Sequence, residues 1–239
     1  MAIIMNFNHL YYYNWNYFLF MLPCFILTIV VQVKMKSTFK KYGSIANSRG
    51  MTGYEAAQRV LAHNDVSGVR IEQIGGSYTD HFDPRTNVIR LSESVYNSNS
   101  IAAVGVACHE AGHAVQYAQG YVPNKIRSFI LPAANIGTKA SWIFIILGLI
   151  TSALQPLLYV GIILFSACVL FTVATLPVEF NASSRALKCV KETGMLSETE
   201  YKGAKHTLQA AAMTYVAAAA TSIMQLLRLI LIASGRNRR

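Results

Sequence analysis

The pentapeptide His109-Glu110-Ala111-Gly112-His113 decides the fold expected of this chain. It lies in a run of small and apolar residues, 100–118, that predicts a buried α-helix. On such a helix His109 and His113 lie one turn apart on the same face, so both imidazoles can bind one metal ion. Glu110 projects about 100° further round the helix, where its carboxylate can contact a water molecule on that ion. A zinc hydrolase needs this arrangement.

A core helix whose histidines are only hydrogen-bonded is the alternative interpretation of the motif. We favour a metal site, because burying two histidines and a glutamate on one helix costs free energy unless something binds them. Cys108 adjoins the motif but points away from the face that carries the histidines, so we do not expect it to bind zinc. The chain has four cysteines and no CxxC pair, which suits a reducing compartment or inert buried thiols.

The composition is typical of a membrane protein. Hydrophobic residues make up 53% of the 239 residues and charged residues only 13%, whereas a soluble domain carries about 25% charged residues. The net charge is +10, and an excess of Lys and Arg is characteristic of the cytoplasmic loops of membrane proteins. The sequence has none of the recognised nucleic-acid-binding motifs. We therefore expect the chain to associate with a lipid bilayer and not with nucleic acid.

Three apolar segments predict three or four membrane-associated helices. Residues 11–33 form a transmembrane anchor, and the lysines that follow it place the next part of the chain in the cytoplasm. Residues 140–178 carry no charge and predict a transmembrane hairpin with a turn near Gln155-Pro156. Residues 207–233 contain Arg228, so a fourth span and a helix lying in the membrane interface are equal alternatives. The anchor opens with aromatic residues that suit an interfacial belt: Tyr11, Tyr12, Tyr13, Trp15 and Tyr17.

Residues 34–130 predict a polar, folded domain that contains the metal-motif helix. Gly53–His63 predicts a helix with Thr52 as its N-cap, and Val69–Ile74 and Asn87–Leu91 predict short strands. A helix, then strands, then an HExxH helix is an order similar to that of zincin-type metallopeptidases. In that fold an edge strand holds the substrate extended. Asn87–Leu91 is our candidate for that strand, with simple packing against the helix as the alternative.

A catalytic zinc ion needs a third protein ligand. Glu179 is our candidate, because it directly follows the uncharged segment 140–178 and a lone carboxylate at a membrane boundary needs a cationic partner. Ser183 shares its helical face and is placed to support the ligands, so we assign residues 179–206 to a third-ligand helix segment. A snorkelling interfacial glutamate is the alternative role for Glu179. The other candidate ligands are His63, His81 with the adjoining turn-forming Asp83, Glu93 and His206.

Five stretches resemble the YugP-type neutral zinc metallopeptidases of bacterial membranes, over nearly the whole chain. They are residues 36–42, 47–53, 80–86, 109–114 and 176–183. A more distant resemblance is to the heat-shock-associated membrane peptidases and the CAAX-prenyl endopeptidases, in which HExxH is followed by a Glu-x-x-x-Asp whose Glu binds zinc. Glu179 matches that Glu, but Ser183 occupies the position of the Asp, so only the role of the glutamate carries over.

The resemblance implies a mainly α membrane protein with a zincin-like (gluzincin) catalytic domain and a small β-sheet. It also implies a multi-pass protein of the bacterial plasma membrane. The lysines after residues 11–33 predict that the catalytic domain lies on the cytoplasmic side. One Zn²⁺ per chain would be held by His109, His113 and Glu179, and a peptide or membrane protein would be the substrate. The sequence indicates neither a particular substrate nor an oligomeric state.

The mechanistic hypothesis is peptide hydrolysis near the cytoplasmic face of the membrane. Zinc lowers the pKa of a bound water to about 7, and Glu110 takes the proton as general base and passes it to the leaving amine. His206 and Arg185 are guesses for the group that stabilises the oxyanion.

Two other functions compete with the peptidase hypothesis. A metal-ion transporter would place the motif inside a membrane span, but the surrounding apolar stretch is too short and too polar. The second alternative is a scaffold in which zinc only stabilises the fold. Such a metal site is closed and needs no base, so the presence of Glu110 in the motif argues against a scaffold.

Overall fold

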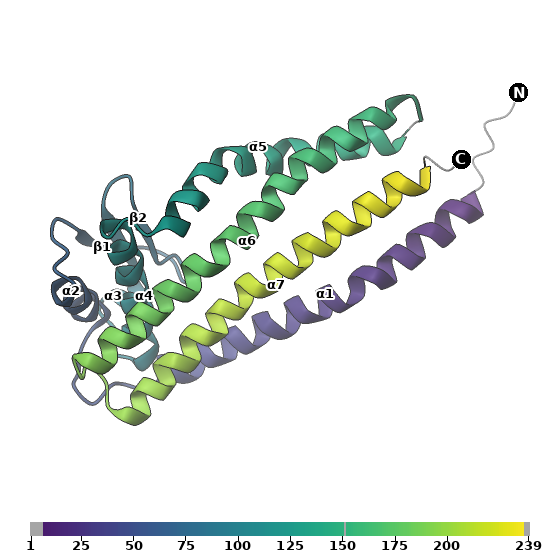
Figure 1. Ribbon diagram of the computed structural model, residues 1–239. Coiled ribbons are helices and arrows are strands. Elements are labelled where there is room, and N and C mark those ends of the chain that lie inside the picture. The colour runs from purple at the N-terminus through teal and green to yellow at the C-terminus, as the bar shows by residue number, and fades with distance from the viewer. Residues whose placement is uncertain (1–6, 151, 237–239) are drawn as a thin grey trace, which may run out of the picture. The chain divides into compact units, whose positions relative to one another are not determined.

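The structure is a computed structural model that describes residues 7–150 and 152–236, with side chains described over 19–150 and 153–235. The protein is mainly helical, with one small sheet (Figure 1). The elements in chain order are α1 (Phe7–Gly43), α2 (Gly53–His63), β1 (Arg70–Ile74), β2 (His81–Asp83), β3 (Val88–Ser92), α3 (Glu93–Tyr96), α4 (Ile101–Ala118), α5 (Val122–Ile150), a 3-10 turn (Ser152–Leu154), α6 (Gln155–Glu192) and α7 (Glu198–Arg236). The aromatic side chains of the predicted interfacial belt lie outside the described residues.

The chain divides into two compact units, and the long helices contribute to both. The described residues of the first unit fall within Met1–Val30, Ile130–Val173 and Val216–Arg239. The second unit consists of Val31–Phe129 and Ala174–Tyr215, and so it contains the sheet, the metal motif and the part of α6 that carries Glu179.

Within the described residues, four helices are long and apolar enough to cross a membrane: those at Leu19–Gly43, Val122–Ile150, Gln155–Glu192 and Glu198–Gly235. The segments 11–33 and 207–233 lie in α1 and α7 respectively, and the segment 140–178 is divided between α5 and α6. The 3-10 turn Ser152–Leu154 lies just before the predicted turn position Gln155-Pro156. The first helix of the hairpin begins at Val122, inside the range predicted for the polar domain.

Small residues bring α5 and α6 together in the first unit. A Cβ added to Gly161 would lie 2.6 Å from a carbon of Ile145, so the two backbones approach too closely for a larger residue. Ile145 and Leu158 pack with Leu229 and Ala233 of α7 in a small buried cluster. Close approach at small residues is typical of helices that pack within a membrane.

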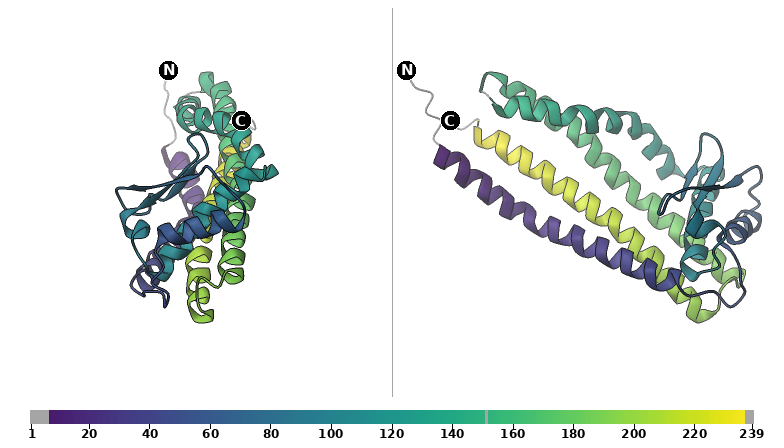
Figure 2. Two further views of the ribbon diagram at one scale, coloured as in Figure 1. Left: turned by 90° about the vertical axis from the view of Figure 1, so that its left-hand side faces the viewer. Right: turned by 180° about the vertical axis from the view of Figure 1, so that it is seen from behind.

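The second unit contains a small sheet (Figure 2). Its strand order is β1-β3-β2. Strand β3 pairs in parallel with β1 and antiparallel with β2, so it lies in the centre of the sheet. The expectation that Asn87–Leu91 is an edge strand is therefore wrong. Four of the five residues of β3 are buried, which agrees with the alternative that this strand packs the core. The sheet edges are β1 and the three-residue β2.

The predicted helix Gly53–His63 is confirmed as α2, with Thr52 as its N-cap. The Thr52 hydroxyl accepts a hydrogen bond from the backbone N–H of Glu55, and the Glu55 carboxylate accepts one from the backbone N–H of Thr52. This capping box satisfies two backbone donors that would otherwise lack partners. It fixes where α2 begins.

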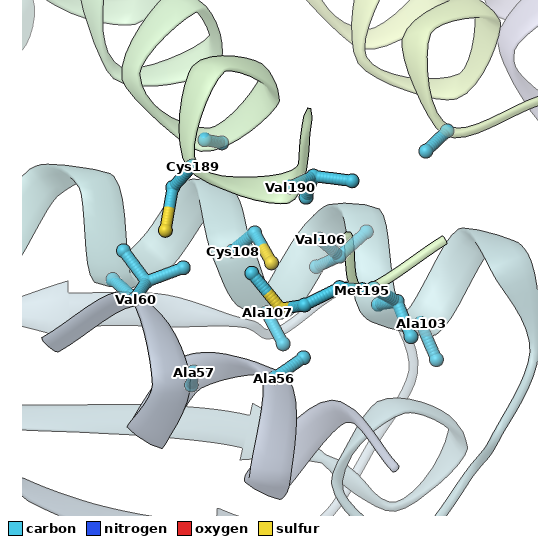
Figure 3. Close-up of a cluster of buried hydrophobic side chains, with 14 of the residues drawn as sticks. Ala56, Ala57, Val60, Ala103, Val106, Ala107, Cys108, Cys189, Val190 and Met195 are labelled. Atoms are coloured by element: carbon cyan, nitrogen blue, oxygen red, sulfur yellow. The ribbon is translucent and has the colours of Figure 1, made fainter. Parts of the chain in front are cut away.

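The main hydrophobic core of the second unit joins α2, α4 and α6 (Figure 3). Alanine residues on α2 and α4 let these helices lie close together, and Cys108 and Cys189 fill the space between α4 and α6 (Figure 3). Both thiols are free and buried. Helix α4 is therefore the central helix of a packed domain, and it is not among the helices suited to spanning a membrane.

Candidate metal centre

Helix α4 holds the HExxH motif in a rigid and buried setting. Ser100 caps its N-terminus by accepting a hydrogen bond from the backbone N–H of Ala103. The helix ends at Gln119 and Gly120, where Gly120 has a φ of +64°. Fourteen of its eighteen residues are buried. The backbone that carries the motif is thus fixed by packing on most of its faces.

The structure brings His109, His113 and Glu179 together. The Nε2 atoms of the two histidines lie 3.1 Å apart, and a Glu179 carboxylate oxygen lies 3.3 Å from the first and 3.4 Å from the second. Ligand atoms placed 2.0–2.1 Å from a tetrahedral zinc ion would be separated by about 3.3 Å. The donor set therefore has the chemistry and the spacing that fit one zinc ion.

The hydrogen bond made by Nδ1 of His113 indicates that Nε2 carries a lone pair that can bind a metal. Nδ1 of His113 lies 3.1 Å from Oε1 of Gln116. The amide nitrogen of Gln116 donates to the carbonyl oxygen of Val178 and to Oδ1 of Asn181, which fixes the orientation of the amide. Because Oε1 can only accept, Nδ1 of His113 carries the proton. In the neutral imidazole the lone pair is then on Nε2, which faces Glu179.

Ser183 orients His109, the other histidine of the cluster. Its hydroxyl is hydrogen-bonded to Nδ1 of His109 at 3.0 Å, as its position on the face of Glu179 led us to expect. Each metal-facing imidazole thus has a partner on its other nitrogen. Such partners orient metal-binding histidines and raise their affinity.

Gly112 lets α6 approach α4 closely enough for Glu179 to reach the histidines. A Cβ at Gly112 would lie 2.7 Å from the carbonyl oxygen of Ala182, which is backbone and cannot rotate away. Ala182 lies between Glu179 and Ser183 on α6, and it is fully buried. The glycine of the motif is thus required by the packing of the two helices.

Electrostatics at the cluster favour a positive charge. Burial lowers the pKa of His113, but the hydrogen bond to Glu179 and the charges of Glu110 and Glu179 outweigh burial and leave the pKa above its ordinary value. A cation in the cluster would meet the same two carboxylates. Cys108 belongs to the hydrophobic core and not to the metal centre. Burial, with a smaller effect from Cys189, raises the pKa of its thiol, so the thiol stays protonated.

Glu110 lies beside the cluster without belonging to it. Its side chain is buried, with only 8% of the residue exposed. No described residue donates a hydrogen bond to its carboxylate. The carboxylate is therefore free to accept a proton from a water molecule, which is what a general base must do.

The structure places the remaining candidate ligands elsewhere. His63 pairs with Glu192 at 3.1 Å, His81 is hydrogen-bonded to the Thr79 carbonyl oxygen, and His206 lies 3.2 Å from the Tyr42 hydroxyl. Within the described residues, His109, His113 and Glu179 form the one group of at least three His, Cys, Asp or Glu side chains able to hold a metal ion. Glu93, at the start of α3, is not in it.

Asp83 forms a turn, as its sequence setting suggested. It accepts hydrogen bonds from the backbone N–H of Arg85 and the hydroxyl of Thr86. These bonds, that of Thr86 first, lower the pKa of Asp83 to about 2.

Three residues near the centre were not found from the sequence. Gln116 offered a signal, because it is a polar residue one turn beyond His113 on an otherwise apolar helix. Asn181 and Tyr215 offered none. The side chain of Tyr215 hydrogen-bonds Glu179 from α7, and Glu110 is close enough to affect it electrostatically. Arg185, one of our guesses for the oxyanion partner, instead donates to Asn181 and Gln119.

The chain is similar to known proteins over most of its length. Residues 17–234 match the family described as "Putative neutral zinc metallopeptidase". The chain belongs to this family. It is also 44% identical, over 206 residues, to the "Putative membrane protease YugP" of Bacillus subtilis (strain 168), and the match covers 86% of this chain and 91% of the relative. No solved structure matches the chain. Together with the four apolar helices, the match supports a metallopeptidase role and association with a membrane.

Proposed function

We propose that this chain is a membrane-bound zinc metalloendopeptidase with a gluzincin-type centre. The observation that carries the proposal is the convergence of two Nε2 atoms and a carboxylate oxygen within 3.4 Å of one another, with the opposite ring nitrogens both hydrogen-bonded. His109, His113 and Glu179 would hold one zinc ion. Zinc would supply the Lewis acid that acidifies water and polarises the scissile carbonyl.

The residues of the chain would perform the proton transfers and the orientation of the site. Glu110 would accept the proton of the attacking water and deliver it to the leaving amine. Gln116 and Ser183 would hold the imidazoles in the tautomer that binds metal. Tyr215, whose side chain hydrogen-bonds Glu179, is the described side chain best placed to donate to an oxyanion, in place of His206 and Arg185.

Features of the structure weaken both alternative functions. A transporter would carry the motif in a membrane span, but α4 is buried in the core of the second unit. A structural zinc site would have four protein ligands. The described residues supply three, together with the glutamate Glu110, which is 8% exposed and does not belong to the ligand group.

We further propose that the second unit lies on the cytoplasmic side of a bacterial plasma membrane, because lysines follow the first apolar segment directly. Peptides or membrane proteins near that surface would be the substrates.

The variant Glu110→Gln tests the catalytic role. It keeps the size of the side chain and removes the base, so we expect zinc to remain bound at one per chain while cleavage of a peptide library falls by at least about 100-fold. Metal content is measured by elemental analysis and cleavage by mass spectrometry. The matched variant Glu93→Gln, at an exposed glutamate of the same unit, should cleave like the wild type. Cleavage by Glu110→Gln at the native rate would exclude Glu110 as the base.

A further inference from the structure

The second unit also contains a candidate site that is separate from the metal cluster. It is a cavity of about 970 Å³ between the described parts of α1, α6 and α7. None of the residues of the metal cluster lines it, and neither do Glu110 and Tyr215. Ser183 lines the cavity and also hydrogen-bonds His109, so it is the link between the two sites.

Three lysines give the lining of the cavity a positive charge. Lys34 and Lys41 of α1 and Lys188 of α6 line it, and no carboxylate does. Lys188 has an exposed partner in Glu192 at 3.8 Å. Lys34 and Lys41 have no acidic partner within the described part of the chain. Three ammonium groups around a cavity without a carboxylate favour a ligand that carries negative charge.

The lining of the cavity also contains apolar side chains. Phe180, Leu187 and Met213 line it, and Phe180 and Met213 are 48% and 41% exposed. Exposed apolar side chains of this size mark places where apolar matter binds. The same cavity thus offers charge and an apolar surface to one ligand.

The sequence changes from charged to apolar at this cavity on all three helices. Lys34 is the first charged residue after the segment 11–33, and Phe180 lies two residues beyond the segment 140–178. On α7 the lining passes from His206 to Met213 as the segment 207–233 begins. These are the positions at which a helix passes from aqueous surroundings to lipid.

We propose that this cavity binds an anionic phospholipid. Lys34, Lys41 and Lys188 contact the phosphate of the head group, and the acyl chain lies against Phe180, Leu187 and Met213. A lipid is favoured over a free phosphate ion, because a phosphate ion would leave the apolar side chains of the lining exposed to water. The inference does not depend on the proposed peptidase activity, because no catalytic residue lines the cavity.

The test measures lipid binding by the purified full-length protein in detergent. Bound lipid is counted by native mass spectrometry during titration with phosphatidylglycerol, phosphatidylcholine or inorganic phosphate. Wild-type protein should bind phosphatidylglycerol tightly and phosphatidylcholine weakly. The triple variant Lys34→Gln, Lys41→Gln, Lys188→Gln should lose affinity for phosphatidylglycerol on the order of 100-fold, since each lysine near an anionic head group contributes about a factor of five.

A matched variant separates a specific site from general attraction. Lys36→Gln, Lys40→Gln and Lys191→Gln remove the same charge from exposed positions on the same two helices, outside the cavity. This variant should bind phosphatidylglycerol like the wild type. Equal losses in both triple variants would overturn the proposal, as would inorganic phosphate displacing the lipid at comparable concentration.

A single substitution keeps the test valid if the triple variant does not fold. Ser184 is exposed and lines the cavity, so Ser184→Glu places a carboxylate there without disturbing the core. Affinity for phosphatidylglycerol should fall while affinity for phosphatidylcholine stays the same. Unchanged binding of phosphatidylglycerol by this variant would show that the lipid lies elsewhere.

Discussion

The tautomer of the His113 imidazole depends on Gln116, a residue outside the proposed metal-ligand set. Gln116 is fully buried, and its amide joins His113 to the backbone of Val178 and to Asn181 on α6. A buried amide with both of its ends satisfied cannot turn over without losing hydrogen bonds. The tautomer of His113 is therefore set by the packing of α4 against α6.

Replacing Gln116 with Met should weaken zinc binding about 10- to 100-fold, the usual effect of removing a partner of a metal-binding histidine. Methionine fills a similar volume but offers no strong acceptor to Nδ1 of His113. Zinc affinity is measured by competition with a chromophoric chelator, and circular dichroism checks that the helices form. Gln58→Met, at an exposed position on α2, is the control and should leave the affinity unchanged. Equal affinity in both variants would contradict the role assigned to Gln116.

The raised pKa of His113 predicts how pH acts on the protein without metal. The pKa is raised above its ordinary value of 6.5 in the folded state, so the proton contributes stability that is fully present below about pH 6.5. That contribution is lost as the pH rises through the folded-state pKa. Zinc must displace the proton, so zinc affinity should fall as the pH is lowered through the same range.

Thermal unfolding of the chelated protein across pH 5 to 9, and zinc titrations over about the same range, check this prediction. Glu179→Gln removes the carboxylate that does most to raise the pKa of His113. The loss of stability between pH 6.5 and higher pH should therefore shrink in this variant. A pH dependence identical to that of the wild type would show that another group is responsible.

At the scale of elements, the contact between α4 and α6 decides whether the metal centre forms. Both helices could be predicted from apolar patterns, but their approach depends on Gly112 meeting the backbone at Ala182. Gly105, two turns earlier on α4, meets Ala204 of α7 at an ordinary contact distance of 3.5 Å. The two glycines therefore differ in how much room a methyl group would have.

Gly112→Ala should separate α6 from α4 and lower both stability and zinc affinity. Forcing a methyl group into such a contact typically costs about 1–3 kcal/mol. Gly105→Ala should be neutral or stabilise the protein by up to about 1 kcal/mol, because alanine favours the helix. Thermal unfolding and zinc titration compare the two variants. If Gly112→Ala bound zinc like Gly105→Ala, the close approach of the helices would not matter to the site.

The sheet shows a limit of local patterns. The sequence predicted strands at Val69–Ile74 and Asn87–Leu91, and the structure has them shifted by one residue at the ends. It did not predict β2, whose three residues are too few to show an alternating pattern. With only two strands predicted, each is an edge strand, whereas pairing with β2 makes β3 central. Which strand is central depends on pairing between distant residues, and local periodicity does not report pairing.

At the scale of the whole molecule, the four apolar helices predict a membrane topology in which the second unit lies on one side of the bilayer. The proposed cytoplasmic location of the second unit gives a direct test with Ser77→Cys, in the exposed loop between β1 and β2. A membrane-impermeant maleimide should label this cysteine only after the cells are permeabilised. Wild-type protein gives the background, because Cys24, Cys108 and Cys189 are buried and Cys168 is partly buried within α6. Labelling in intact cells would place the unit outside.

The sequence by itself determined the metal motif, the capped helix α2, the apolar segments and Glu179 as a candidate ligand. Each follows from residues close together in the chain: spacing along one helix, a cap beside its helix, or one carboxylate at the end of an uncharged run. Only the tertiary structure decided that Glu179 and not His81 lies beside the histidines, that β3 is central, and that Gln116, Ser183 and Tyr215 surround the site. These facts depend on which helices and strands meet, and such meetings are set by the packing of residues far apart in the chain.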